Sequence, residues 1–453
     1  MNYYALLDQQ VKENGDKVFL QLEEESYTYA DIRDRAAAVA AAIELSPQVV
    51  LVEAKHFISQ LVLFFAVQAA GCVPVLLHHD LPAGEVAVLL EKSGIRAMIT
   101  DRDGELGVSI SLPENYGRLE LFAGELISLP QNEDICVGVL SSGSSGVPKL
   151  MLRSYESWAG FFPVQNQIFK VGPCCKLFLQ GSLSFTGNLN TALSVLFAGG
   201  TIVTSQAFRC RTWFSLLSRF SVNVLYLVPA KLKLLLPFCR EKLLSVKMVF
   251  TGSQLLGKMA AKKLREAFPA SEILLYYGAS ELNYITYISY EDMLKNPQSV
   301  GWPFPGVELS VRDGYVYVDT PYHVYGTMLP FTVKDAGYLT DDGELIFAGR
   351  KQAIINRGGV KVSCLKVELA IREIAGVKDA AVLPYADEKR GSEIAVFIAV
   401  EKKMRQRELI QQIRQRLPRA EQPHRFIFLD EMPLNDRGKV DAENLKQHLA
   451  VDA

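Results

Sequence analysis

The sequence predicts an α/β fold in which a large N-terminal domain of stacked α/β subdomains, with a small antiparallel β-barrel-like part, precedes a small α+β domain. Three observations lead to this prediction. Helical stretches alternate with short β-branched runs up to about residue 345, and Gly and Pro punctuate short strands between residues 296 and 346. A different mixture of helices and strands then follows. We expect domains at residues 1–349 and 350–453, for which 453 residues leave ample room.

The N-terminal elements follow from the period of the apolar residues. Some segments repeat apolar residues at helical spacing, whereas others are short continuous runs typical of buried parallel strands. The expected helices are residues 30–43, 57–70, 211–220 and 256–268, and the expected strands are residues 49–53, 135–140, 200–204, 222–227 and 247–251.

One segment approaches the length of a membrane span, because residues 61–77 carry no formal charge. Gln68, Gly71 and Pro74 interrupt this run where a helix would end. We therefore expect a buried helix, a turn and a short strand at residues 73–77, and no transmembrane segment.

The remaining elements belong to the antiparallel part and the C-terminal domain. The expected antiparallel strands are residues 308–312 and 315–318. In the C-terminal domain, the expected helices are residues 368–374 and 407–417, and the expected strands are residues 379–384 and 393–400.

Composition excludes several classes of protein. With 49% hydrophobic and 22% charged residues, the chain is globular and neither disordered, collagen-like nor coiled-coil. A net charge of −2 gives no overall attraction for nucleic acid, although 20 Lys and Arg against 15 Asp and Glu make residues 350–453 mildly basic. Seven cysteines without a C-x-x-C pattern predict reduced core thiols, and the absence of a signal region favours the cytoplasm. The histidines lack metal-ligand spacing, and two of them, His78 and His79, are adjacent.

A hydroxyl- and glycine-rich loop follows the strand at residues 135–140. It runs Ser141-Ser142-Gly143-Ser144-Ser145-Gly146-Val147-Pro148-Lys149. In such a loop, backbone N–H groups and hydroxyls bind phosphate oxygens, and the lysine adds positive charge. It is not a Walker loop, since Pro148 precedes the lysine and Leu150 follows it. The alternative is a flexible Ser/Gly linker, which the Pro-Lys ending beside a buried strand disfavours.

This loop resembles the phosphate-binding signature of the adenylate-forming enzymes, the superfamily of acyl-CoA synthetases, nonribosomal-peptide adenylation domains and firefly luciferase. Further segments match motifs of that family in the family's order. They are Tyr277-Gly278-Ala279-Ser280-Glu281, Gly349-Arg350 with Gly359-Val360-Lys361-Val362, and Pro433-Leu434-Asn435-Asp436-Arg437-Gly438-Lys439-Val440. The resemblance spans nearly the whole chain, and it is strongest to the acyl-CoA synthetases.

The resemblance implies a site for ATP and Mg²⁺. Glu281 would bind Mg²⁺, Asp335 and Arg350 would bind the ribose, and Lys149, Glu281 and Lys439 would be the catalytic residues. A carboxylate beside a phosphate loop also makes electrostatic sense only with a cation between them. The alternative role of Glu281 is that of a surface glutamate, and that of Asp335 is an ordinary turn aspartate. Arg350 could instead form a salt bridge at the domain hinge. The implied ATP-binding residues are Ser141, Ser142, Gly143, Ser144, Ser145, Gly146, Lys149, Gly252, Ser253, Tyr277, Gly278, Ser280, Asp335, Arg350 and Lys439.

The resemblance also implies that the C-terminal domain is mobile and carries Lys439 into the site, where this lysine bridges the acid carboxylate and the α-phosphate. An isolated lysine in a polar loop is otherwise solvated surface. The sequence departs from the family in three places. Gln352 stands at the hinge in place of Lys or Asp, Val333-Lys334 replaces Thr-Gly before the aspartate, and Tyr155 stands where the family often has His.

The implied acyl pocket is lined by Phe185, Gly252 and Tyr276, with Phe185 as its gate. Core packing is the alternative role for each of them. Amino-acid-activating relatives place an aspartate after the gating aromatic residue, to pair with the substrate ammonium, and Thr186 occupies that position here. The resemblance therefore favours a plain carboxylic acid.

The implied activity is that of an AMP-forming acid–thiol ligase. Acid and Mg·ATP give an acyl-adenylate and pyrophosphate, and the acyl group then passes to coenzyme A with release of AMP. One alternative acceptor is the phosphopantetheine arm of an acyl carrier protein. A second alternative is a non-catalytic nucleotide-binding relative. The departures at Val333-Lys334, Gln352 and Tyr155 motivate it, and the retained Lys149, Glu281 and Lys439 argue against it. The identity of the acid, and the choice between a monomer and a homodimer, stay open.

Overall fold

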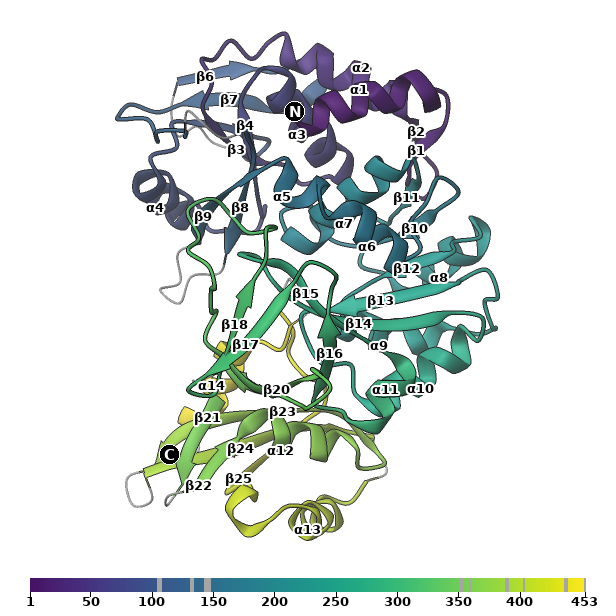
Figure 1. Cartoon of the computed structure of the whole chain (residues 1–453), viewed down its shortest axis with the longest axis vertical. Coiled ribbons are helices and arrows are strands. Elements are labelled where there is room, and N and C mark those ends of the chain that lie inside the picture. Colours follow the sequence, from purple (N-terminus) through teal and green to yellow (C-terminus); the bar gives the residue numbers. More distant parts are fainter. Residues whose placement is uncertain are drawn as a thin grey trace.

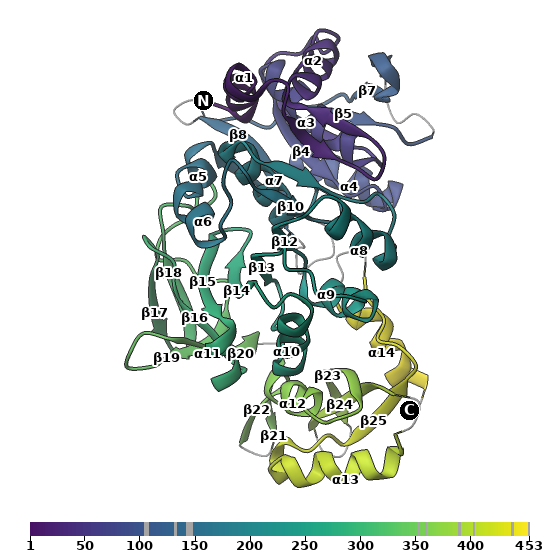
Figure 2. The same cartoon turned by 90° about the vertical axis from the view of Figure 1, so that its right-hand side faces the viewer.

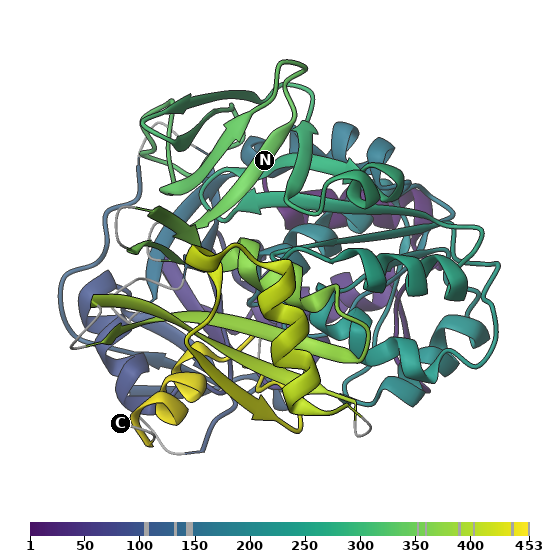
Figure 3. The same cartoon turned by 90° about the horizontal axis from the view of Figure 1, so that it is seen from below.

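The computed structural model describes residues 1–103, 108–130, 134–141, 148–350, 353–357, 360–387, 391–401, 404–435 and 439–451. The described strands form four sheets, two in a large N-terminal part and two in a small C-terminal part. Figure 1 shows the C-terminal part at the end of the molecule opposite the N-terminus, and Figure 3 shows it lying across that end of the large part. The expected mixed α/β architecture is confirmed.

The first sheet has seven strands in the order β6-β7-β5-β3-β4-β8-β9, and its central strands β5, β3, β4 and β8 are parallel. The strands are β3 (Val49–Glu53), β4 (Val73–Leu77), β5 (Ala97–Thr100), β6 (Val108–Ser111), β7 (Arg118–Leu121), β8 (Ile135–Ser141) and β9 (Lys149–Ser154). The helices of this region are α1 (Tyr3–Asn14), α2 (Tyr29–Ala40), α3 (Phe57–Ala69) and α4 (Ala83–Ser93).

The uncharged segment at residues 61–77 folds as expected. Helix α3 is buried from Gln60 to Gln68 and ends before a turn at Gly71, where φ is +77° and glycine is favoured. Strand β4 follows, with all five residues buried. No helix within the described ranges combines the length and the apolar character that a membrane span needs.

The second sheet has thirteen strands in the order β17-β18-β19-β20-β16-β15-β14-β13-β12-β10-β11-β1-β2. Its parallel strands are β1 (Val18–Gln21), β10 (Lys176–Phe178), β11 (Thr201–Val203), β12 (Val224–Tyr226), β13 (Met248–Gly252) and β14 (Glu272–Ala279), and the short β2 (Ser26–Thr28) pairs with β1. The helices of this region are α5 (Glu156–Ala159), α6 (Phe162–Ile168), α7 (Thr186–Ala198), α8 (Cys210–Arg219), α9 (Pro229–Leu235), α10 (Lys258–Ala267) and α11 (Tyr290–Lys295).

The antiparallel strands expected between residues 296 and 346 continue this sheet, with β17-β18-β19-β20 as a meander whose last strand pairs with β16. They are β15 (Asn283–Ser289), β16 (Ser299–Pro303), β17 (Glu308–Arg312), β18 (Tyr315–Asp319), β19 (Asp335–Leu339) and β20 (Leu345–Arg350). One hydrophobic core extends through most of the large part, and a smaller one lies between β3, β4 and α4.

The C-terminal part has its own core. Its elements are β21 (Ile354–Arg357), β22 (Val360–Ser363), α12 (Cys364–Arg372), β23 (Val377–Asp387), β24 (Gly391–Val400), α13 (Gln406–Arg416), β25 (Arg425–Leu429) and α14 (Ala442–Val451). Val367 of α12 and Leu409 of α13 pack on one face of the sheet β23-β24-β25, while Leu445 of α14 packs with Phe397 on the other. Figure 2 shows α9 and α10 on the side of the large part that faces α12 and β23.

The cysteine prediction needs one correction. All seven cysteines are free, and Cys72, Cys136, Cys175 and Cys364 are buried as expected. Cys174, by contrast, is exposed, because it lies in the turn that precedes β10 and not in the strand itself.

Candidate active site

Polar residues gather at the carboxyl ends of four neighbouring parallel strands, β10, β12, β13 and β14. Gln180 follows β10, Lys231 lies in the helix after β12, Ser253 follows β13 and Ser280 follows β14. Ligands of open α/β sheets bind at this edge, because the loops there are free of the strand ladder. The strand order therefore brings together segments that are up to a hundred residues apart in the sequence.

The first turn of α7 is the centre of this arrangement. Phe185, just before the helix, stacks on the ring of His78 at the end of β4, with ring centroids 5.0 Å apart. The hydroxyl of Ser280 donates to the hydroxyl of Thr186 at 3.4 Å. At Gly187 a Cβ atom would lie 2.4 Å from the Tyr226 hydroxyl, so only glycine fits there.

A buried arginine holds the turn that carries Ser280 and Glu281. Arg153, on β9, is fully buried and donates to the carbonyl oxygens of Ser280 at 2.6 Å and Tyr322 at 3.0 Å. Its guanidinium lies 5.1 Å from the Trp158 ring centre. Burial lowers the pKa of Arg153 to about 10, and the nearby charge of Glu281 opposes this shift. The arginine remains a cation at neutral pH and fixes β9 beside the turn.

The hydroxyl- and glycine-rich loop connects β8 to β9. Ser141 ends β8 and pairs with Lys149, an exposed residue that begins β9. The residues between them that were expected to bind ATP, namely Ser142, Gly143, Ser144, Ser145 and Gly146, lie outside the described residues. The N–H of Tyr325 donates to the carbonyl of Leu152 at 2.8 Å. Strand β9, which follows the loop, is thereby held beside Tyr325 and, through Arg153, beside the turn at Ser280.

Asp335 is brought next to Tyr277. The Tyr277 hydroxyl donates to Oδ2 of Asp335 at 2.7 Å, and Asp335 is only 5% exposed. Asp335 lies opposite Arg350 in the pairing of β19 with β20. The preceding Lys334 is exposed, with φ of +63°, so this departure from the family turns away from the carboxylate.

Two predicted pocket residues pack against each other within the sheet. At Gly252 a Cβ atom would lie 2.4 Å from the Tyr276 ring, and the Tyr276 hydroxyl is 2.9 Å from that of Tyr226. Burial raises the pKa of Tyr276 well above its ordinary value. Gly278 is equally constrained, since a Cβ atom would lie 2.6 Å from the carbonyl oxygen of Asn283.

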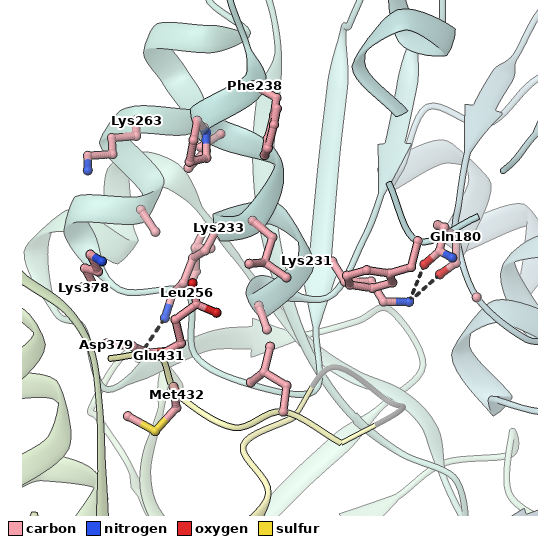
Figure 4. A pocket seen from close by; sticks show the side chains of 18 of the residues that line it. Gln180, Lys231, Lys233, Phe238, Leu256, Lys263, Lys378, Asp379, Glu431 and Met432 are labelled. Atoms are coloured by element: carbon pink, nitrogen blue, oxygen red, sulfur yellow. Dashed lines mark hydrogen bonds and ion pairs between the residues drawn. The ribbon is translucent and has the colours of Figure 1, made fainter. Parts of the chain in front are cut away.

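A cavity of about 1600 Å³ lies between the large and small parts, and Figure 4 shows its lining from close by. Phe185, Gly181 and Lys231 line it from the large part, and Asp379 and Asn435 line it from the small part. Gly252 and Tyr276 do not line it, so the structure does not place these two predicted pocket residues beside Phe185 in this cavity.

Lys439 belongs to a hairpin that lines this cavity through Leu434 and Asn435. The N–H of Lys439 donates to the side-chain oxygen of Asn435 at 3.0 Å, and the N–H of Asn435 donates to the Lys439 carbonyl at 2.8 Å. A β-bridge between Leu434 and Val440 closes the same hairpin. Residues 436–438, Gln352 and the side chain of Arg350 lie outside the described residues.

An ion pair joins the two parts at the other end of the cavity. The ammonium of Lys233 on α9 lies 3.2 Å from Oδ1 of Asp379 on β23, which Arg372 also contacts at 2.7 Å (Figure 4). Burial alone would raise the pKa of Asp379, but the charges of Arg372 and Lys233 outweigh it and hold this pKa below its ordinary value. The carboxylate is therefore ionised at neutral pH.

Sequence reasoning missed the roles of Arg153, Lys231 and His78. Arg153 lies two residues after Met151 on β9, so the two side chains are on the same face of the strand, and both are buried. Lys231 and Lys233 lie two residues apart on the short, mostly apolar helix α9, and their local sequence does not tell which of the two lysines lacks a carboxylate partner. Tyr155, which stands where the family often has His, is a core residue. Its ring packs against that of Tyr3, with ring centroids 5.1 Å apart.

Comparisons with known proteins place these features in context. The family model described as "AMP-binding enzyme" matches residues 7–328, and "AMP-binding enzyme C-terminal domain" matches residues 366–439. An uncharacterized acyl-CoA ligase, YhfT, of Bacillus subtilis is 27% identical, with 96% of this chain and 95% of that protein covered. A D-alanine–D-alanyl carrier protein ligase of Bacillus licheniformis is 25% identical, with 95% of this chain and 96% of that protein covered.

The fold matches solved structures over the whole chain. One is O-succinylbenzoate coenzyme A synthetase (MenE) of Bacillus subtilis in complex with ATP and magnesium ion. Its TM-score is 0.83 at 20% identity, and 97% of this chain and 99% of that chain are covered.

Proposed function

The chain belongs to the AMP-binding enzyme family, and from this premise we propose that it is an acyl-CoA ligase. In the first step, a carboxylate oxygen of the acid attacks the α-phosphorus of ATP, and pyrophosphate leaves as the acyl-adenylate forms. In the second step, the thiol of coenzyme A attacks the acyl carbonyl carbon, loses its proton, and displaces AMP. The formation of an acyl-adenylate is common to the family, and the choice of thiol is our proposal.

The observation that supports this proposal most is the set of hydrogen bonds around the Ser280–Glu281 turn. Arg153 connects this turn to β9, and Ser280 connects it to Thr186 at the start of α7. Strand β9, which follows the phosphate loop, the turn, and the first turn of α7 beside Phe185 therefore meet in one region. A reaction between a nucleotide and an acid needs such proximity, since holding the reactants together removes much of the entropic cost.

The residues at the nucleotide site have suitable chemistry for their proposed roles. Ser141 and Lys149 would bind the phosphates, and the Asp335 carboxylate, oriented by Tyr277, would accept hydrogen bonds from the ribose hydroxyls. Arg350 would contribute from the adjacent strand. Tyr277 and Gly278 would border the adenine, together with Gly252 and Ser253 on the neighbouring strand.

The carboxylate of Glu281 fits a magnesium ion. It makes no hydrogen bond or ion pair within the part of the chain that the structure describes, and it follows a strand that ends at the nucleotide site. Hard divalent cations bind carboxylate oxygens and phosphate oxygens together. When bound there, Mg²⁺ would neutralise phosphate charge.

Lys439 would complete the site during the first step. The hairpin that carries it lines the same cavity as Phe185, through Leu434 and Asn435. From there its ammonium would bridge the acid carboxylate and the α-phosphate, and stabilise the charge of the transition state. We place the domain boundary near residue 350 and the hinge at Gln352. Rotation there would withdraw Lys439 before the thiol enters.

The interdomain cavity would admit the pantetheine arm of coenzyme A. A relative named as an acyl-CoA ligase supports this acceptor. The relative that is named as a carrier protein ligase supports the alternative, in which the same arm belongs to a carrier protein. Three exposed apolar side chains line the cavity, those of Phe208, Leu234 and Phe238. They would pack against the surface of a carrier protein or against the pantetheine arm itself.

An acceptor assay tests the proposal. The protein is incubated with Mg·ATP, a panel of carboxylic acids and either coenzyme A or a holo-carrier protein, and acyl-thioesters are detected by mass spectrometry. Apo-carrier protein, which lacks the thiol arm, is the control. We expect acyl-CoA from one class of acid. Acylation of the holo-carrier alone would show that the acceptor is a carrier protein and not coenzyme A. ATP binding without any thioester or pyrophosphate would favour a non-catalytic relative.

A further inference from the structure

One buried cation faces the cavity next to the acid gate. Lys231, on α9, is 5% exposed and lines the cavity. Its ammonium donates to the carbonyl oxygen and to the side-chain oxygen of Gln180, both at 2.8 Å, and lies 5.8 Å from the Phe208 ring centre. Figure 4 shows the lysine extended toward Gln180.

This cation has no anionic partner among the residues that the structure describes. None of their carboxylates lies at ion-pair distance from the Lys231 ammonium, which bonds only to Gln180. Two residues later, Lys233 lines the same cavity and does have a partner, Asp379. An ammonium has three N–H donors, and Gln180 takes two of them. Burial without a counter-charge is costly and lowers the pKa of Lys231 to about 8. An uncharged hydrogen-bonding side chain at position 231 would connect α9 to Gln180 without the cost of desolvating a charge.

The ammonium lies beside the predicted acyl pocket. A Cβ atom built on Gly181 would be 2.9 Å from Nζ of Lys231, 3.2 Å from the side-chain nitrogen of Asn188 and 3.9 Å from the Phe185 ring. All three groups therefore lie close around Gly181, where a side chain would collide with the ammonium of Lys231. Phe185 directly precedes Thr186, whose hydroxyl contacts Ser280 at the proposed reaction centre.

We propose that the third donor of Lys231 binds a second carboxylate of the substrate, so that the acid is a dicarboxylic acid. One carboxylate would react at the Thr186–Ser280 end, and the other would accept a hydrogen bond from Lys231 where this lysine lines the cavity. The inference rests on the proposed function, because it names the substrate class of the same acyl pocket. It also agrees with Thr186, which stands where amino-acid-activating relatives have an aspartate. The positive charge of Lys231 would repel the ammonium group of an amino-acid substrate.

Non-reacting adenylate analogues test the proposal by binding alone. Acyl-sulfamoyl adenosines would be compared in pairs of equal chain length, succinyl with butyryl, glutaryl with valeryl and adipoyl with hexanoyl. In at least one pair, we expect the analogue with the terminal carboxylate to have a dissociation constant lower than that of its methyl-terminated partner by about tenfold or more. This is the factor that one hydrogen bond to a charged group contributes. In Lys231→Met the ratio within that pair should fall to about one.

Lys233→Met is the matched control, since this lysine lies on the same helix and lines the same cavity. It should change the affinities of both analogues equally and leave their ratio unchanged. Methyl-terminated analogues that bind as tightly as their carboxylate partners to the wild type would overturn the inference alone. So would a preference that survives in a folded Lys231→Met protein. Failure of the wild type to bind any of the analogues would overturn the proposed function as well.

Discussion

The hydroxyl of Tyr277 donates a hydrogen bond of 2.7 Å to the Asp335 carboxylate, which joins the carboxyl end of β14 to the start of β19. In our account this pair presents the carboxylate to the ribose. Asp335→Asn should raise the KM for ATP by about tenfold or more, because charge-assisted hydrogen bonds to the diol are lost. Tyr277→Phe should raise it by only about fivefold, because the carboxylate remains and loses only the hydrogen bond that orients it.

The measurement for this pair is the KM for ATP in a pyrophosphate-release assay. Asp319→Asn, on the exposed end of β18, is the matched control and should not change it. An unchanged KM in Asp335→Asn would remove Asp335 from the nucleotide site.

Arg153 should stabilise the fold as well as the site. Arg153→Met leaves the carbonyl oxygens of Ser280 and Tyr322 without their donor inside the protein. Since each unsatisfied buried group costs about 1–3 kcal/mol, the free energy of unfolding should fall by about 2–5 kcal/mol. Urea unfolding measures this change, and Arg211→Met, at an exposed position of α8, should have almost no effect. Equal stability of the two variants would contradict the role of Arg153.

Two cavity glycines form a natural comparison. Gly181 and Gly257 both have positive φ, +119° and +77°, but only at Gly181 would a Cβ atom meet other side chains. Both alanine variants should lose stability through backbone strain. Only Gly181→Ala should raise the KM for the acid, by about tenfold, because its methyl group occupies the space beside Lys231. A similar rise in Gly257→Ala would show that strain alone explains the effect.

The pH dependence of stability should report on Lys231. Burial lowers its pKa to about 8 in the folded protein, whereas an unfolded lysine titrates near about 10.4. Between these values the unfolded chain binds more protons, so stability rises with pH. Relative to Lys231→Met, the wild type should gain up to about 1.4 kcal/mol per pH unit between about pH 8 and pH 10.

Urea unfolding of both proteins at pH 7, 8, 9 and 10 measures this difference. Other groups that line the cavity, such as His78 and Asp80, are present in both proteins and cancel to first order. A difference that stays constant or falls with rising pH would contradict the burial of a charged Lys231.

Much of the fold is predictable because local patterns and tertiary packing agree. The strands at residues 49–53 and 308–312 were predicted with the bounds that the structure has, since their apolar or alternating patterns are unambiguous. The helix predicted at residues 30–43 begins at Tyr29 and ends earlier than predicted, at Ala40. The order of the thirteen-stranded sheet is not predictable from periodicity, because its neighbours, such as β1 and β11, are distant in sequence.

The site is predictable where a motif carries it and hidden where only packing does. Ser280, Glu281 and Asp335 belong to segments with a sequence signature. The burial of Lys231 depends on Gln180, and the stacking of His78 depends on Phe185, and both contacts bridge chain segments that have no common sequence pattern. Pairing across such distances is set by the sheet order and not by local sequence.

Pyrophosphate release from Mg·ATP across a panel of carboxylic acids would show whether the protein forms acyl-adenylates through Lys439, with wild type, Lys439→Ala and Lys446→Ala compared. Lys446, exposed on α14 beside Glu443, is the matched control. We predict release with one class of acid, a loss of about a hundredfold or more in Lys439→Ala, and no loss in Lys446→Ala. Absence of release with every acid despite ATP binding, or full activity in Lys439→Ala, would contradict the account.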